Sequence, residues 1–245
     1  MIRLSLGNVG SGKTLMEVRE MALNPTGLKT YTNIATKGIK SAIAIKPEMI
    51  VKKTPIPKGK TGKQKYDLSL NLDYWKSIKE PINIVIDEAH ILLNPRRSMS
   101  KVNIVMTDWV ALIRRVLGQA ESGEGNLVLI TQLWNRLDTL IRDMATQVRY
   151  HVCHYSKRCK ECSRVWHETS EWPEPLHACP WCHSRKVVKF GHIIEIRFFT
   201  AVDEFIEWKI NGTMTFYKHQ VVTDSEKYFK LYDTLQWDNL FSELY

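Results

Sequence analysis

The chain has 245 residues, of which 44% are hydrophobic and 25% charged, and its formal net charge is +9. This composition is ordinary for a globular protein, and the length allows one large α/β domain with a small insertion. No run of about 18 apolar residues occurs, so we expect no transmembrane helix. The N-terminus runs directly into a predicted strand, so we also expect no signal peptide and a cytoplasmic location.

The positive charge is concentrated in the first part of the chain. Residues 1–150 hold 23 Lys and Arg against 13 Asp and Glu, whereas residues 200–245 hold 4 against 8. A basic front of this kind indicates either a polyanionic partner or general solubility, and both interpretations stay open.

The first predicted elements surround a glycine-rich loop. A short apolar strand at residues 2–6 is followed at once by GNVGSGKT, and a helical pattern continues to residue 23. The loop matches G-x-x-x-x-G-K-[ST] in full and has the required strand before it and helix after it. Glycines allow backbone N–H groups to approach phosphates, and the helix N-terminus adds partial positive charge. We therefore expect ATP to bind to Gly7, Asn8, Val9, Gly10, Ser11, Gly12, Lys13 and Thr14.

Within this loop, two side chains have distinct expected roles. Lys13 can reach the β- and γ-phosphates, and the Thr14 hydroxyl can hold Mg²⁺. Further along, residues 29–34 are β-like, and residues 52–66 carry six lysines, two prolines and no acidic residue. We predict an exposed loop there, and contact with nucleic-acid phosphates or a simple solvated excursion are both open.

A second motif follows the apolar run that begins at residue 82. This predicted buried strand places Asp87 and Glu88 at its carboxyl end, where ligands of open α/β sheets collect. Asp87 suits the Mg²⁺ site, and Glu88 suits a base that orients or deprotonates the attacking water. The adjacent glutamate favours hydrolysis over phosphoryl transfer to a small molecule. The letters DEAH also suggest a helicase box, but such helicases use two tandem nucleotide domains, and this chain has room for one.

The next elements continue the alternation of strands and helices. A helical stripe covers residues 105–117, and a strand ends at Thr131 and Gln132, whose amide can contact the γ-phosphate or the water. Residues 135–148 read as a helix, and RYHVCHYS reads as a strand. This order predicts a mainly parallel sheet covered on both faces.

Four cysteines form a typical metal-ligand pattern. Cys159 and Cys162 make one C-x₂-C pair, and Cys179 and Cys182 make a second one sixteen residues later. This spacing predicts a four-thiolate Zn²⁺ site in a zinc ribbon. The ribbon serves either as a structural staple or as a nucleic-acid grip, since Lys, Arg and Trp surround it. Cys153 lies outside the pattern, and we expect it to be a buried strand thiol.

The remaining sequence completes a three-part organisation. Residues 192–201 and 204–222 read as strands, the second turning at 211–213 like a hairpin, and the aromatic end packs on the domain or a partner. We expect a P-loop ATPase core at residues 1–155, a zinc-ribbon insertion at 156–190, and C-terminal strands with an aromatic tail at 191–245.

Taken in order, these motifs resemble one group of proteins. The glycine loop, IVIDEAHILLNPR, LVLITQ, LDTLIRDMATQVRY and KLYDT together resemble the zonular-occludens-toxin-like proteins. That group includes the assembly ATPases of filamentous phages and belongs to the FtsK/HerA-type branch of P-loop motors. The resemblance covers most of residues 1–155 and YFKLYDTLQ near the end. It implies a RecA-like α/β fold and a Mg²⁺-dependent ATPase using Lys13, Glu88 and Gln132.

The resemblance also implies a homo-oligomeric ring in which an arginine of a neighbouring subunit completes each site. Seven arginines are candidates: Arg96, Arg97, Arg114, Arg115, Arg136, Arg142 and Arg149. Arg115 and Arg142 are our working choices. The implied partners are DNA and a capsid or portal-type protein.

Two departures from the resemblance modify the expected function. Filamentous-phage assembly ATPases usually continue into a membrane span and lack a four-cysteine insertion. We therefore expect a motor that moves DNA during viral genome packaging or virion assembly, in the host cytoplasm and transiently on the virion. A nucleotide-switched zinc-ribbon module that binds nucleic acid or capsid protein, and a plasmid-transfer or segregation ATPase, are the alternatives. Glu88 argues against a pure switch, which has less need of a water-activating base.

Overall fold

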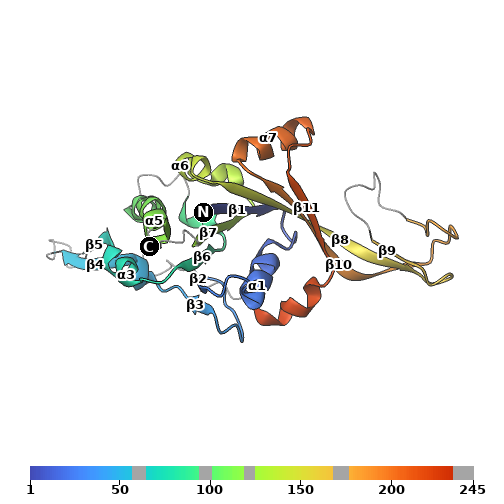
Figure 1. The fold of residues 1–245 in the computed structure, drawn as a ribbon, viewed down its shortest axis with the longest axis horizontal. Coiled ribbons are helices and arrows are strands. Elements are labelled where there is room, and N and C mark those ends of the chain that lie inside the picture. Colours follow the sequence, from blue (N-terminus) through green and yellow to red (C-terminus); the bar gives the residue numbers. More distant parts are fainter. Residues whose placement is uncertain (57–64, 94–100, 119–124, 168–176, 234–245) are drawn as a thin grey trace.

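The computed structural model describes residues 1–56, 65–93, 101–118, 125–167 and 177–233. At its centre lies a nine-stranded sheet with the order β11-β10-β8-β1-β7-β6-β2-β3, and β9 pairs with β8 (Figure 1). The neighbouring strands β3, β2, β6, β7, β1 and β8 are parallel, whereas β9, β10 and β11 run antiparallel to their neighbours. The strands are β1 (Ile2–Gly7), β2 (Lys29–Thr32), β3 (Ala42–Ala44), β6 (Ile82–Ile86), β7 (Asn126–Thr131), β8 (Gln147–Cys159), β9 (Val165–His167), β10 (Val187–Phe199) and β11 (Lys218–Val222).

Helices cover both faces of this sheet. In Figure 1, α1 and η3 lie below the sheet, α6 and α7 lie above it, and α5 lies to its left. The bounds are α1 (Lys13–Leu23), α2 (Pro47–Ile50), α3 (Leu72–Ser77), α4 (Ala89–Leu92), α5 (Lys101–Gly118), η2 (Trp134–Arg136), α6 (Thr139–Asp143), α7 (Val202–Asn211) and η3 (Ser225–Leu231). The predicted mainly parallel sheet with helices on both faces is therefore confirmed.

Successive side chains of one strand pack into the buried clusters on opposite faces of the sheet. In β7, Leu127 belongs to the same buried cluster as Trp109 of α5. The next residue, Val128, belongs instead to the cluster that contains Val18 of α1. Because successive strand residues point to opposite faces, a strand buried on both sides reads as a continuous apolar run.

Two predicted elements are wrong. The helix expected at 135–148 is limited to η2 and the short α6, because Asp138 caps α6 by accepting a hydrogen bond from Leu140 N and β8 already begins at Gln147. The hairpin turn expected at 211–213 is absent, since α7 occupies that region and Gly212 ends it at φ 71°. Acidic residues in the first turn and apolar residues at helical spacing favour this helix.

The predicted lysine-rich loop is shorter than expected. Strands β4 (Val51–Ile56) and β5 (Lys65–Leu70) form an antiparallel hairpin, so both ends of the expected loop are strand. Its base is anchored because Val51, Leu68 and Leu70 pack in the main core. Residues 57–64 lie outside the described part of the chain.

Strands β8 and β10 extend beyond the body of the molecule as an arm (Figure 1). Both strands continue through the predicted boundaries at 155/156 and 190/191, with a shift of register between Lys189 and Gly191, so the arm shares the central sheet. The C-terminal part of the chain packs back as expected up to residue 233, where η3 buries Tyr228 against α1. Within the described ranges, no helix combines the length and apolar character needed to cross a bilayer.

Candidate nucleotide site

The glycine-rich loop joins β1 to α1 at the carboxyl edge of the sheet. Gly12 adopts φ 86°, in the left-handed region, and a Cβ there would lie 2.5 Å from Ile194 Cδ1. The left-handed conformation therefore favours glycine at this position, and a Cβ would also displace the end of the Ile194 side chain. Because Gly12 provides no side-chain cap, the first N–H groups of α1 are left for a ligand.

Two side chains of the loop point inward. The Lys13 ammonium donates to the carbonyl oxygens of Gly7 at 3.0 Å and Asn8 at 2.8 Å, so it lies inside the loop that it closes. Burial lowers the pKa of Lys13, and the carboxylates of Asp87 and Glu88 offset part of this effect. The Ser11 hydroxyl is buried and has no hydrogen-bond partner among the described residues. A phosphate would supply both groups with an acceptor.

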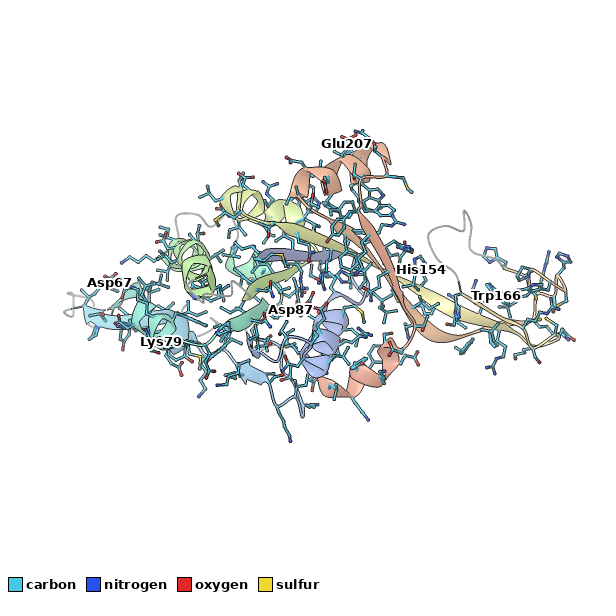
Figure 2. The ribbon with its side chains drawn as sticks, viewed as in Figure 1. Asp67, Lys79, Asp87, His154, Trp166 and Glu207 are labelled. Carbon is cyan, nitrogen blue, oxygen red and sulfur yellow. The ribbon has the colours of Figure 1, made fainter. Side chains whose placement is uncertain are left out.

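The loop and the second motif meet through one hydrogen bond. Thr14 Oγ1 donates to Asp87 Oδ2 at 2.8 Å, which joins the first turn of α1 to the end of β6. Figure 2 labels Asp87 near α1. Burial raises the pKa of Asp87, although the hydrogen bonds from Thr14 and from Glu88 N act in the opposite direction. Two hard oxygen donors lie side by side here, and this donor set fits Mg²⁺.

Glu88 has an unusual backbone conformation and a defined set of partners. Its φ of 51° lies in the left-handed region, which a non-glycine residue adopts at some energetic cost. Gln132 Nε2 donates to Glu88 Oε1 at 2.9 Å, so the predicted sensor holds the predicted base. The second carboxylate oxygen, Oε2, lies 3.3 Å from Nδ1 of His90.

His90 completes this group on the side of β7. Its Nδ1 lies 3.1 Å from the Thr131 hydroxyl, and burial lowers the pKa of the ring although the Glu88 carboxylate acts in the opposite direction, which favours the neutral imidazole. A neutral histidine leaves the negative charge of Glu88 available to act on a water molecule.

Asn33 and His90 were missed by the sequence analysis. Asn33, just after β2, donates from Nδ2 to Asp87 O at 3.0 Å and accepts from Asp87 N at 2.7 Å. His90 is the fourth letter of DEAH, so its position beside the motif was a usable signal. Asn33 lies 54 residues from Asp87 in the sequence, and nothing in the local pattern distinguishes it.

The candidate trans arginines are placed only in part. Arg142 of α6 donates to Thr139 Oγ1 at 3.1 Å, and its guanidinium lies 5.6 Å from the centroid of the Trp134 ring. Arg149 pairs with Glu20 near the amino end of β8, away from the nucleotide site. The side chains of Arg114 and Arg115 and all of Arg96 and Arg97 lie outside the described part. Arg136 is exposed, close enough to His90 to affect its charge.

The four cysteines of the arm converge at its end. Cys159 Sγ lies 3.5 Å from Cys182 Sγ, Cys162 Sγ lies 3.5 Å from Cys179 Sγ, and all four sulfur atoms are within 4.8 Å of one another. Four sulfurs around a tetrahedral Zn²⁺ at about 2.3 Å would be about 3.8 Å apart, so this arrangement fits the ion. Cys153 lies apart, half-buried against the core cluster of α1.

Comparisons with known proteins place these features in context. A sequence model of the family described as zonular occludens toxin (Zot) matches residues 1–159. The N-terminal domain of zonular occludens toxin from Neisseria meningitidis has 18% identity and a TM-score of 0.47, covering 95% of this chain and 98% of that chain. The genome packaging NTPase B204 of Sulfolobus turreted icosahedral virus 2, in complex with ATP-gammaS, has 15% identity and a TM-score of 0.36, covering 61% and 74%. No curated protein matches the sequence.

Proposed function

Because the chain belongs to the zonular occludens toxin (Zot) family, we propose that it is a Mg²⁺-dependent ATPase. The observation that carries the proposal is the 2.8 Å hydrogen bond between Thr14 and Asp87. It connects a complete phosphate-binding loop with an acidic pair at the end of a buried strand, which is the arrangement that ATP hydrolysis by P-loop proteins requires.

Each residue has a specific role in this proposal. The N–H groups of the loop and the Lys13 ammonium hold the phosphates, and Thr14 with Asp87 holds Mg²⁺. When bound, the ion neutralises charge on the β- and γ-phosphates. Glu88 orients the attacking water and accepts its proton, while Gln132 keeps the Glu88 carboxylate in place through the 2.9 Å hydrogen bond.

The test is ATP turnover by two variants. Lys13→Ala is expected to lose nucleotide binding and turnover together, because the phosphates lose their cation. Glu88→Gln is expected to bind ATP with unchanged affinity but to lose turnover, because the amide is not a base. Full activity in both variants would overturn the proposal, and a single slow turnover by the wild type would favour a nucleotide-controlled switch instead.

We further propose that the ATPase works as a ring in which Arg115 or Arg142 of a neighbouring copy completes each site. A trans arginine is testable by mixing, because a subunit lacking the arginine and a subunit lacking Glu88 can form some complete sites together. Arg142→Ala and Glu88→Gln chains should each be inactive alone and partly active when mixed. If mixing restores nothing, Arg142 does not act in trans.

The proposed substrate of the motor is DNA, moved during viral genome packaging or virion assembly, as the resemblance implies. The arm offers stacking groups for such a partner: Arg164 lies 5.4 Å from the Trp181 ring centroid, and Arg158 lies 4.9 Å from that of Phe190. Both rings are nearly half exposed, at 46% and 47%. Residues 156–190 hold seven Lys and Arg against four Glu, so stacking supports binding more than net charge does.

DNA binding is tested with arm variants under conditions of ATP turnover. Trp181→Ala and Phe190→Ala are expected to weaken DNA binding by about 10-fold each, because each removes one stacking platform. Tyr217→Ala is the matched control, since Tyr217 is an exposed ring (54%) outside the arm. Equal loss in all three variants, or turnover that DNA never changes, would contradict the assignment.

We also propose that Cys159, Cys162, Cys179 and Cys182 bind Zn²⁺ and hold the end of the arm together. The convergence of the four sulfurs supports this, and the small cluster they form with Trp166 is too small to fold without a staple. Elemental analysis should find one zinc per chain, lost in Cys159→Ser and Cys179→Ser and retained in Cys153→Ser. Zinc retained in the first two variants would contradict the site.

A further inference from the structure

The strongest remaining feature is the contact between Asn33 and Asp87. Asn33 faces the backbone of Asp87 with both ends of its amide, donating at 3.0 Å and accepting at 2.7 Å. It therefore satisfies both backbone groups of the residue at the end of β6, as an additional strand would. A side chain that fixes the backbone of Asp87 also fixes the carboxylate that faces Thr14.

The loop that carries Asn33 is held from the other side by the C-terminal segment at residues 231–233. Lys37 N donates to Leu231 O at 2.7 Å, and Asp233 N donates to Ala35 O at 3.1 Å. These two bonds flank an antiparallel bridge between Thr36 and Tyr232. We call residues 231–233 the strap, because they cross the loop after β2 and join it to the body.

The strap is anchored in the core and lies near the site. Leu231 and Tyr232 pack against the clusters of buried residues that α1 forms with the sheet. The pKa of the Tyr232 phenol is raised by burial and by the negative charge of Asp87, so the ring is within electrostatic reach of that carboxylate. Asp87 is thus linked to the C-terminal part of the chain through a single short loop.

We propose that Asn33 is the positioning residue for Asp87 and that the strap holds Asn33 in place, so that both set the Mg²⁺ affinity of the nucleotide site. This inference rests on the proposed ATPase function. Groups that orient a metal ligand through hydrogen bonds change metal affinity about 10- to 100-fold when removed. The phosphates are held by different groups, Lys13 and the loop, so nucleotide affinity without metal should depend little on Asn33.

The experiment compares two asparagines that brace neighbouring strands. Asn33→Ala is expected to raise the Mg²⁺ concentration for half-maximal binding of a fluorescent ATP analogue at least 10-fold, with binding in EDTA changed less than 2-fold. Asn83→Ala is the matched control, because Asn83 Oδ1 accepts from Asn126 N at 3.2 Å at the opposite end of β6. It should change neither value.

A second pair of variants tests the strap. Asp233→Pro removes the N–H that donates to Ala35 O. It is expected to raise the Mg²⁺ concentration for half-maximal binding of the ATP analogue at least 3-fold. Lys37→Ala removes only the exposed 3.4 Å ion pair to Asp233 and should leave it unchanged. If Asn33→Ala does not fold, Asn33→Ser and amide hydrogen exchange at Asp87 N–H in the folded chain replace it, with faster exchange expected.

The outcomes separate this inference from the proposed function. An Asn33→Ala chain whose Mg²⁺ requirement is unchanged overturns the inference, whatever its stability. Equal weakening with Mg²⁺ and in EDTA also overturns it, because Asn33 would then support the whole loop. If instead the wild type hydrolyses no ATP but Asn33→Ala still shifts Mg²⁺-dependent nucleotide binding, the proposed function fails and the positioning role stands.

Discussion

Helix α1 connects two clusters of buried charge that lie at opposite ends of β1. At the amino end of the strand, Arg3 pairs with Glu17 and Glu20, and Arg149 also pairs with Glu20. Burial alone would lower the pKa of Arg3, but the two carboxylates raise it, and the pKa of Glu20 is lowered by Arg3 and Arg149 although burial acts in the opposite direction. Two cations and two anions therefore pair with one another in this cluster, although burial still raises the pKa of Glu17.

At the carboxyl end the charges are arranged differently. Lys13 donates to two backbone carbonyl oxygens, and Asp87 accepts a hydrogen bond from the Thr14 hydroxyl rather than from a cation. Burial shifts the pKa of Lys13 down and that of Asp87 up, so both charged forms lack full compensation. The cluster at the amino end is closed, because each charge faces an opposite charge, and removing one member leaves its partner buried and unpaired. The cluster at the carboxyl end is open, because its charged groups remain available to a ligand.

The largest expected effect comes from Lys13→Met at the open cluster. ATP turnover should fall at least about 10³-fold, or about 4 kcal/mol, because the phosphates lose a buried cation. The free energy of unfolding should change by less than about 1 kcal/mol, since a poorly compensated buried charge is replaced by an apolar chain of similar length. Phosphate release and urea unfolding measure the two quantities. A large loss of stability would show that Lys13 belongs to a closed cluster after all.

The same substitution at the closed cluster should have the opposite profile. Arg3→Met leaves Glu17 buried without its cation and should lower the free energy of unfolding by about 3 kcal/mol. The loss stays at the lower end of the usual range because burial already raises the pKa of Glu17, so the carboxyl can become neutral. Turnover per folded chain should stay within about 3-fold of wild type. Denaturant unfolding at pH 7 is the measurement, and a stable but inactive Arg3→Met chain would refute the comparison.

His151 is influenced by cations of both clusters, and its titration makes the stability of the fold depend on pH. Burial, together with the positive charges of Arg149, Lys13 and Arg3, lowers its pKa to about 3, although the hydrogen bond that Nδ1 donates to Leu6 O at 3.1 Å acts in the opposite direction. The unfolded chain takes up this proton below pH 6.5, whereas the folded chain does not. Stability is therefore fully present above pH 6.5 and falls as the pH decreases towards 3.

For this histidine the expected loss at pH 5 is about 2 kcal/mol relative to pH 7. His151→Asn keeps a donor for Leu6 O and cannot titrate, so its stability should fall by about 2 kcal/mol less than that of wild type over the same range. The difference between the two chains is the relevant quantity, because carboxylates and cysteines titrate equally in both. Parallel pH curves would mean that His151 is protonated in the folded protein.

The local signals in the sequence predicted much of the candidate site. The glycine loop and Asp87 depend on residue types at fixed spacing next to an apolar strand, and both lie where those patterns place them. Gln132 was expected at the same edge as Glu88, since neighbouring parallel strands end there, but its predicted partner was the γ-phosphate or the water and its hydrogen bond to Glu88 was not predicted. The four cysteines converge because their spacing allows two short turns to face each other.

Other features depend on contacts that no local pattern contains. Helix α7 was predicted as a strand because Phe205, Ile206 and Trp208 suit either structure, and packing against β8 and β10 decided between them. The predicted helix at 135–148 failed for the converse reason, since the end of that segment is needed as a sheet strand. The contacts of Asn33 and of the strap could not be predicted from the sequence, because their partners are distant along the chain.

The smallest expected effect is that of Gln132→Met, which tests how the open cluster is kept ordered. The substitution removes the donor to Glu88 Oε1 and keeps the length of the side chain. A hydrogen bond to a charged group contributes about 1.5 kcal/mol, so turnover should fall about 10-fold as the carboxylate loses its orientation. ATP affinity should stay within 2-fold, because Glu88 rather than a phosphate is the partner of the amide.

Gln147→Met is the matched control at the other end of the sheet, where the amide donates to the exposed Tyr217 hydroxyl at 2.8 Å. Loss of affinity with unchanged turnover would instead make Gln132 a phosphate ligand, and the base would then depend on His90 alone.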